Sequence, residues 1–187
     1  MVKIVKLNNQ TDQLIAQLKN HDRKVQYDFY KKHSPKLLSV IRMYISDIHY
    51  AEEVLSNSFV KIFKKIDSFN GPSVAIHNWV RTIAVREAIN FLRKKKDIAY
   101  PSDQLEDKHT DGSNPINDEH NLAYLQEKID KLPYGYKMVF MLYVIEGYSH
   151  KAIAGELGIN EGTSKSQLYK ARKMIKQLLA KDDYANG

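Results

Sequence analysis

Residues 149–176 read SHKAIAGELGINEGTSKSQLYKARKMIK, and this stretch predicts two helices joined by a tight turn. Ser149 is a favourable N-cap for a short helix, and Gly158 suits the left-handed backbone that ends one. The small Ala154 allows close helix crossing, and Asn160 can cap a second helix. A short helix, a Gly-containing turn and a second helix together form a helix-turn-helix.

The second of these helices has an apolar side and a basic side. Leu168, Ala171 and Ile175 recur at helical spacing and should face inward. All charges after Glu161 are basic as far as residue 176, whereas a solvated helix usually mixes its signs. A solvated basic helix is the alternative, but the capping residues around it favour a groove-binding helix. We therefore expect DNA contacts from Lys165, Ser166, Tyr169, Lys170, Arg172 and Lys173.

Composition excludes several classes of function. The 187 residues hold 29 Lys and Arg against 22 Asp and Glu, a net charge of +7 that permits a polyanionic partner. Cysteine is absent, the seven histidines lack metal-ligand spacing, and the adjacent Glu52 and Glu53 cannot face each other across a site. We expect no enzyme activity, no metal and no cofactor. The longest apolar run, VFMLYVI, is too short to span a bilayer, so we expect a cytoplasmic protein without membrane insertion.

The chain divides into two all-α domains. Apolar residues recur at helical spacing through residues 11–96 and again through 122–181, and no strand-type alternation is sustained. Residues 97–121 are rich in Asp, Pro, Ser and Asn and too poor in apolar residues to fold alone. We interpret them as an acidic flexible linker.

Local signals predict the helix boundaries of the first domain. Thr11 should cap its first helix, and Ser34 followed by Pro35 should separate two later helices. The last helix should bury Trp79, Ile83, Ala84, Ala88 and Leu92.

That last helix also carries a polar stripe, Thr82 to Arg93, and follows a polar loop over 69–78. A basic helix beside such a loop can hold a nucleic-acid backbone while unstacked bases are read in a pocket. The alternative is a solvated face next to a core tryptophan; we favour core packing for Trp79 and DNA contact for the stripe. The expected DNA contacts are Asn70, His77, Asn78, Arg86, Asn90 and Arg93.

The preceding helix presents a different surface. Its core face is predicted to be Leu55, Phe59, Ile62 and Ile66, which leaves other apolar side chains outside the stripe. Exposed apolar area of this kind suggests a protein partner, although Phe63 alternatively forms the edge of a broad core face. The expected partner surface consists of Glu52, Glu53, Asn57, Val60, Lys61 and Phe63.

Three blocks carry a resemblance to a known family. They are AEEVLSNSFVKIFKKIDSF (51–69), NWVRTIAVREAINFLRKKK (78–96) and, from Leu132 to Ile175, LP…VFMLYVIEGYSHKAIAGELGINEGTSKSQLYKARKMI. In this order, with a linker between, they resemble bacterial sigma factors of the sigma-70 family. More narrowly, they resemble its extracytoplasmic-function (ECF) group, which keeps only regions 2 and 4.

The resemblance implies a four-helix region 2-like domain and a region 4-like helix-turn-helix domain. It implies that the helix over 52–65 docks on the clamp helices of the largest catalytic subunit of RNA polymerase. Segment 69–93 would melt and read the −10 promoter element, helix 160–176 would read the −35 element, and the linker would run near the RNA channel. The function implied is promoter-specific transcription initiation, with core RNA polymerase, promoter DNA and an anti-sigma factor as partners.

The chain departs from the family pattern at two places. Ser56-Asn57 stand where Gln-Glu is usual, which implies altered docking strength. Ser164 and Gln167 stand in GTSKSQL where the family has GTVKSRL, which implies changed packing and a changed −35 preference.

The alternative function is a self-sufficient helix-turn-helix transcriptional regulator, which would share the C-terminal domain. Such a regulator normally needs a dimer interface to bind paired half-sites, and the acidic linker and second basic helix fit it poorly. The two functions differ in one observable: a regulator shifts promoter DNA alone, whereas a sigma factor needs core polymerase.

Overall fold

The computed structural model describes the backbone of residues 2–99 and 118–185 and the side chains of 10–95 and 124–180. Within these ranges the chain is helical and contains no strand, so the all-α prediction is confirmed. It forms two compact units, Met1–Pro101 (unit 1) and Ser102–Gly187 (unit 2). No described helix combines the length and the apolar character that a membrane crossing requires.

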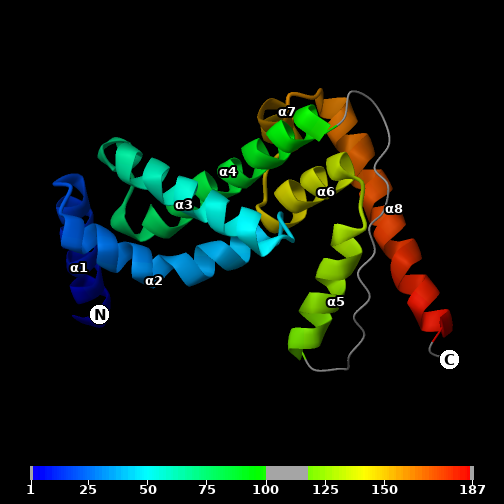
Figure 1. The fold of residues 1–187 in the computed structure, drawn as a ribbon. Coiled ribbons are helices and arrows are strands. Elements are labelled where there is room, and N and C mark those ends of the chain that lie inside the picture. The colour runs from blue at the N-terminus through cyan, green and yellow to red at the C-terminus, as the bar shows by residue number, and fades with distance from the viewer. Residues whose placement is uncertain (1, 100–117, 186–187) are drawn as a thin grey trace. The chain divides into compact units, whose positions relative to one another are not determined.

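Over residues 2–99, unit 1 contains four α-helices and two short 3₁₀ turns; Figure 1 shows their arrangement. Asp22 and Asp47 cap the second and third helices, each accepting two backbone N–H bonds at 2.9 and 3.1 Å. The elements are α1 (Val2–Lys19), α2 (Arg23–Arg42), α3 (Ile48–Lys65), the turns Ile66–Ser68 and Ser73–Ala75, and α4 (Ile76–Ala99).

The core of unit 1 lies where α2, α3 and α4 pack on one another. The predicted face of α3 is confirmed, because Leu55, Phe59, Ile62 and Ile66 are all buried. From the other two helices the core receives Phe29, Leu37, Ile41, Ile76, Val80, Ala84 and Ala88.

Two predicted helix starts are wrong. Thr11 lies inside α1, and Pro35 lies inside α2 instead of opening a new helix. A proline inside a helix removes one backbone hydrogen bond and costs about 3 kcal/mol. Pro35 itself is exposed, but the buried stripe of α2 continues on both sides of it, from Phe29 to Ile41. Burying several large side chains at about 1.5–3 kcal/mol each outweighs that cost. Ser34 consequently caps nothing; its hydroxyl donates to the carbonyl of Tyr30 at 2.5 Å.

The buried face of α4 is also displaced from the predicted one. Ala84 and Ala88 are fully buried as expected, but Trp79, Ile83 and Leu92 are only half-buried. Because α4 contacts α2 as well as α3, its deepest positions also include Val80, Val85 and Ile89. Trp79 lies at the rim, its ring 5.4 Å from that of Phe69.

Unit 2 contains α5 (Asp118–Asp130), α6 (Tyr134–Phe140), α7 (His150–Leu157) and α8 (Glu161–Ala185). A π-helical turn, Met141–Ile145, continues α6 and closes with a bond from the Glu146 N–H to the Met141 carbonyl. The core of unit 2 is made by Met138, Val139, Met141, Leu142, Ile153, Leu168 and Ala171.

The helices extend into the segment expected to be a linker. Residues 97–99 belong to α4 and 118–121 to α5, so both ends of the segment predicted to be a linker, 97–121, are helical. Its middle part, 100–117, lies outside the described residues.

A buried histidine makes the stability of unit 1 depend on pH. His33 is 7% exposed, and its ring lies 4.2 Å from that of Phe29 and 5.1 Å from that of His77. Burial, followed by the positive charges of His77, Lys32 and Lys36, lowers the pKa of His33 to about 4. Protonation therefore favours the unfolded chain, where the pKa is 6.5.

We expect unit 1 to keep this contribution above pH 6.5 and to lose it progressively as the pH falls to about 4. The loss is on the order of 3 kcal/mol. Urea unfolding followed by the fluorescence of Trp79, the single tryptophan of the chain, measures it in unit 1. A His33→Leu variant should give a flatter pH profile, and an unchanged profile would contradict the assignment to His33.

Candidate nucleic-acid and partner-binding surfaces

The helix-turn-helix of unit 2 has the backbone that its sequence predicts. The Ser149 hydroxyl accepts the N–H of Ala152 at 3.2 Å and caps α7. Gly158 ends α7 in the left-handed region with φ of +67°, and the Asn160 side chain caps α8 by accepting the N–H of Thr163 at 2.6 Å. These local bonds set the turn between α7 and α8.

The outward side of α8 is basic and accessible. Leu168, Ala171 and Ile175 are buried, whereas the six side chains expected to contact DNA, from Lys165 to Lys173, are all exposed, Tyr169 to 69%. Their spacing places them along one broad side of the helix, where a phosphate backbone or base edges can approach.

Two of these basic side chains already have partners within unit 2. Lys165 pairs with Glu161 one turn away, at 2.7 Å between Nζ and Oε1. This hydrogen bond lowers the pKa of the Glu161 carboxyl. Arg172 lies over the ring of Tyr143 at 5.7 Å. Breaking the Lys165–Glu161 pair would cost little, because exposed ion pairs are weak.

The two departures in GTSKSQL face the interior of unit 2. Ser164 is fully buried, and its hydroxyl is hydrogen-bonded to Nδ1 of His150 at 2.9 Å. The His150 ring stacks on Tyr143 at 4.6 Å. Gln167 is half-buried against α6, where a Cβ added at Gly135 would lie 2.9 Å from its Nε2. The buried Ser164 can therefore influence the outward side of α8 only through the position of the helix.

In unit 1 the polar residues expected to contact DNA lie on α4 and the loop before it. Asn70, His77, Asn78, Arg86 and Arg93 are exposed, and Asn90 is half-buried and accepts a bond from Arg93 at 3.0 Å. The span from His77 to Arg93 along the helix is about 24 Å. At 100° per residue, however, Arg86, Asn90 and Arg93 lie on the side of α4 opposite His77. The polar groups therefore form two patches, one around His77 and one from Arg86 to Arg93.

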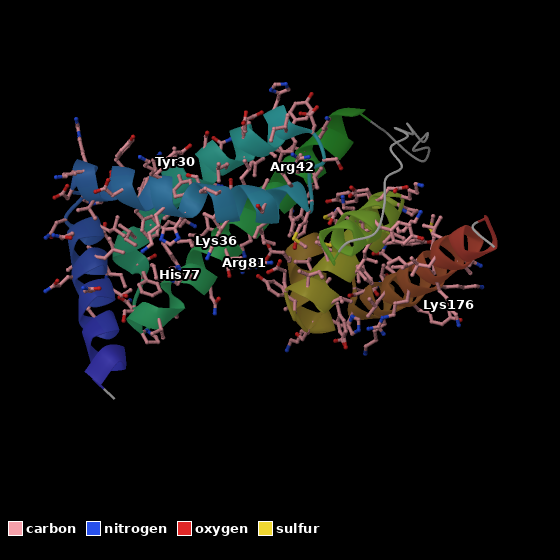
Figure 2. All side chains as sticks on the ribbon, turned by 90° about the horizontal axis from the view of Figure 1, so that it is seen from below. Tyr30, Lys36, Arg42, His77, Arg81 and Lys176 are labelled. Atoms are coloured by element: carbon pink, nitrogen blue, oxygen red, sulfur yellow. The ribbon has the colours of Figure 1, made fainter. Side chains whose placement is uncertain are left out.

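Sequence reasoning missed two cations beside His77. Figure 2 shows Lys36 of α2 and Arg81 of α4 on the same side of unit 1 as His77. The charges of Lys36 and His77 both lower the pKa of the buried His33, so both side chains lie close to His33. Arg81 lies one helical turn after His77, a signal that the sequence offers; the approach of Lys36 depends on how α2 packs on α4.

The expected partner surface on α3 is only partly accessible. Val60 is 51% exposed, and Glu52, Glu53 and Asn57 are exposed beside it. Lys61 is bound to Glu87 of α4 at 2.5 Å. Phe63 is half-buried, its ring 5.8 Å from Phe59 and 6.4 Å from Phe29, so it also forms the edge of the core.

A groove of about 520 Å³ lies between α2 and α3 next to this surface. Its lining includes Tyr30, Pro35, Leu38, Glu52 and Ser56. The described side chains contain no cluster of His, Asp or Glu arranged to hold a metal ion.

Comparisons with known proteins cover both units. Residues 29–98 match the family model of sigma-70 region 2, and residues 122–175 match that of sigma-70 region 4. RNA polymerase sigma factor SigV of Bacillus subtilis is 31% identical over 140 residues, which cover 75% of this chain and 82% of that protein. The ECF RNA polymerase sigma-E factor of Escherichia coli K12 is 27% identical over 180 residues, 88% of this chain and 92% of that protein.

A solved structure has a similar fold. It is the sigma factor RpoE of Bartonella quintana in complex with the anti-sigma factor NepR. The similarity has a TM-score of 0.51 with 23% identity and covers 82% of this chain and 97% of that one.

We expect the Ser164–His150 bond to hold α8 against α7. Replacing Ser164 by Ala removes a bond between partly and fully buried groups, with an expected cost of about 1 kcal/mol. Hydrogen exchange of the α8 amides, followed by mass spectrometry on the full chain, should show faster opening. Ser166→Ala is the matched control, because that hydroxyl is exposed and bonds only to the Thr163 carbonyl of its own helix. Equal protection in wild type and Ser164→Ala would contradict this role.

Proposed function

The chain belongs to the sigma-70 family, in its extracytoplasmic-function group, and we propose that unit 1 docks on core RNA polymerase and opens the −10 element while unit 2 reads the −35 element. Its function is that of a sigma factor, which directs transcription initiation at specific promoters. The observation that supports this division of tasks is that each unit presents one amphipathic helix, α4 or α8, with an accessible polar and basic side.

For the −35 element, the proposal is that α8 enters the major groove by its N-terminal end. Lys165, Ser166, Tyr169 and Lys170 then reach base edges, and the later Arg172 and Lys173 hold phosphates. Their exposure on the side opposite the buried Leu168 and Ala171 supports this orientation. Lysine can donate to the guanine acceptors O6 and N7, so Lys165 and Lys170 are the discriminating candidates.

For the −10 element, the proposal is that α4 holds the separated strand while the loop before it binds an extruded base. Arg86 and Arg93 supply exposed cations for phosphates, and Asn70, His77 and Asn78 supply hydrogen-bonding groups for the base. Such bonds offset part of the cost of unstacking, which is a few kcal/mol. Lys36 and Arg81 lie on the side of unit 1 that carries His77, whereas Arg86 and Arg93 lie on the other side of α4.

For polymerase, the proposal is that the exposed face of α3 docks on the clamp helices. An apolar anchor among polar neighbours is the usual centre of such an interface, and Val60 among Glu52, Glu53 and Asn57 has that arrangement. Lys61 and Phe63 contribute less, because each also has a structural partner within unit 1.

Three further assignments complete the proposal. The chain acts in the cytoplasm, where polymerase transcribes, and catalyses no reaction itself. An anti-sigma factor is a further partner, by analogy with the Bartonella quintana relative that is bound to one.

Lys170→Ala should change which −35 sequences are used, because a good base contact is worth roughly 1–3 kcal/mol of discrimination. Run-off transcription with core polymerase, on a promoter library randomised over the −35 element, measures the preference by sequencing the transcripts. Lys170 is a cleaner test than Lys165, whose loss would leave Glu161 unpaired near the DNA.

Lys173→Ala is the matched control for this experiment. It should weaken all −35 sequences alike and lower the salt slope of binding by about one unit. If Lys170→Ala leaves the −35 preference unchanged, α8 does not read bases through that residue. No transcription above core polymerase alone would overturn the proposed function as a whole.

Val60→Ser should raise the Kd for core polymerase by roughly fivefold to thirtyfold, the effect of losing an interface anchor worth about 1–2 kcal/mol. Helicity should not change, because the side chain is exposed. Val74→Ser is the matched control, since Val74 is 64% exposed in the turn before α4 and outside the proposed docking face. Fluorescence titration of labelled protein with core enzyme gives both values, and equal affinities would place docking elsewhere.

A further inference from the structure

The first helix of unit 1 is joined to the loop that precedes α4. The ammonium group of Lys19, at the end of α1, donates a hydrogen bond of 2.8 Å to the backbone carbonyl of Phe69. The two residues are 50 positions apart and the bond is partly buried. A charged donor makes a hydrogen bond shorter and roughly twice as strong as a neutral one.

Other contacts hold α1 at the same place. Ile15 and Leu18 are buried, and α1 packs on both short turns between α3 and α4 (Figure 1). His21, just after α1, lies 3.4 Å from the carboxylate of Asp67 in the first of these turns. The segment that connects α3 to α4 therefore packs against α1.

Phe69, whose carbonyl accepts the Lys19 bond, also makes contacts through its ring and its N–H. The Phe69 side chain is buried, packs against Trp79 at 5.4 Å between ring centroids, and leaves only 3.3 Å to a Cβ added at Gly71. Its N–H donates to the carbonyl of Ile66 at 3.0 Å. The ring of Phe69 is thus packed and its N–H and carbonyl are both hydrogen-bonded, so the position of Phe69 in the loop is well defined.

Phe69 is followed directly by Asn70, which faces solvent. The carbonyl of Phe69 and the N–H of Asn70 belong to one planar peptide group, so a bond that orients the oxygen also orients the Asn70 backbone. Asn70 is exposed and is the first hydrogen-bonding residue of the loop proposed to bind an extruded −10 base.

We propose that Lys19 is a positioning residue for −10 recognition: through the Phe69 carbonyl it sets where Asn70 meets the extruded base. The inference rests on the proposed −10 function of this loop. It assigns part of promoter specificity to α1, which precedes the residues 29–98 that match the region 2 model. Placement of a reading group matters because misplaced hydrogen-bond partners leave polar groups unpaired.

The test is the discrimination among −10 sequences by the holoenzyme. Lys19→Met keeps the long side chain and removes the donor. Transcription from a promoter library randomised over the −10 element, read by sequencing, gives the ratio of preferred to disfavoured sequences. We expect Lys19→Met to lower this ratio by roughly threefold to tenfold, a fraction of what a full base contact supplies. Lys24→Met, an exposed lysine at the start of α2, should leave the ratio unchanged.

The ratio separates positioning from mere stabilisation. A loss of stability lowers the active fraction equally for every promoter and cancels in the ratio. Trp79 fluorescence verifies that unit 1 is folded at the assay temperature. If Lys19→Met does not fold, Lys19→Gln takes its place, since its side chain is polar but one atom too short for the bond. Lys19→Arg, which keeps a cationic donor, should retain most of the discrimination.

The outcomes also separate this inference from the function on which it rests. If Asn70→Ala loses discrimination while Lys19→Met keeps it, the bond only stabilises the fold and the inference is overturned. An equal loss in Lys19→Arg and Lys19→Met would overturn it as well, because the donor would not be the cause. If Asn70→Ala itself keeps full discrimination, Asn70 does not read the −10 element and the inference fails with its premise. The −10 assignment of the loop fails as well only if His77→Ala and Asn78→Ala also keep full discrimination.

Discussion

A helix that faces a polyanion must be held from its opposite side. Like charges one turn apart on a helix destabilise it by about 0.2–0.5 kcal/mol per pair. In α8 the repulsion among the basic side chains is offset by the burial of Leu168, Ala171 and Ile175. A large buried apolar side chain contributes about 1.5–3 kcal/mol. Burial therefore outweighs repulsion, and α8 can present unbalanced charge to DNA while it stays folded. The polar side of α4 depends on its buried side in the same way.

This constraint explains where the acidic groups of the two helices lie. Glu161 pairs with Lys165 at the exposed start of α8, where solvent screens the ion pair and it is easily exchanged. Glu87 of α4 instead binds Lys61 of α3, with only 13% of the Glu87 side chain exposed. The first pair leaves Lys165 free to change its partner. The second joins the proposed polymerase-docking helix to the proposed strand-opening helix within one unit.

The sequence by itself determined the features that depend on neighbouring residues. Ser149, Gly158 and Asn160 predicted the helix-turn-helix correctly, because capping bonds and a left-handed glycine act within a few residues. The apolar repeat from Leu55 to Ile66 predicted the buried face of α3, since helical periodicity alone decides which side chains share a face. The same periodicity identified the exposed basic side of α8.

Tertiary structure decided what depends on residues far apart. Pro35 has a helix-starting signature, yet it lies inside α2 because packing on α3 and α4 outweighs one lost hydrogen bond. Ser164 looks like a polar substitution in a core until His150, 14 residues earlier, supplies its partner. Lys19 gives no signal at all in the sequence; its role depends on a carbonyl 50 residues away. A hydrogen bond at such a separation forms only where the packed helices bring donor and acceptor together, and no local pattern encodes that placement.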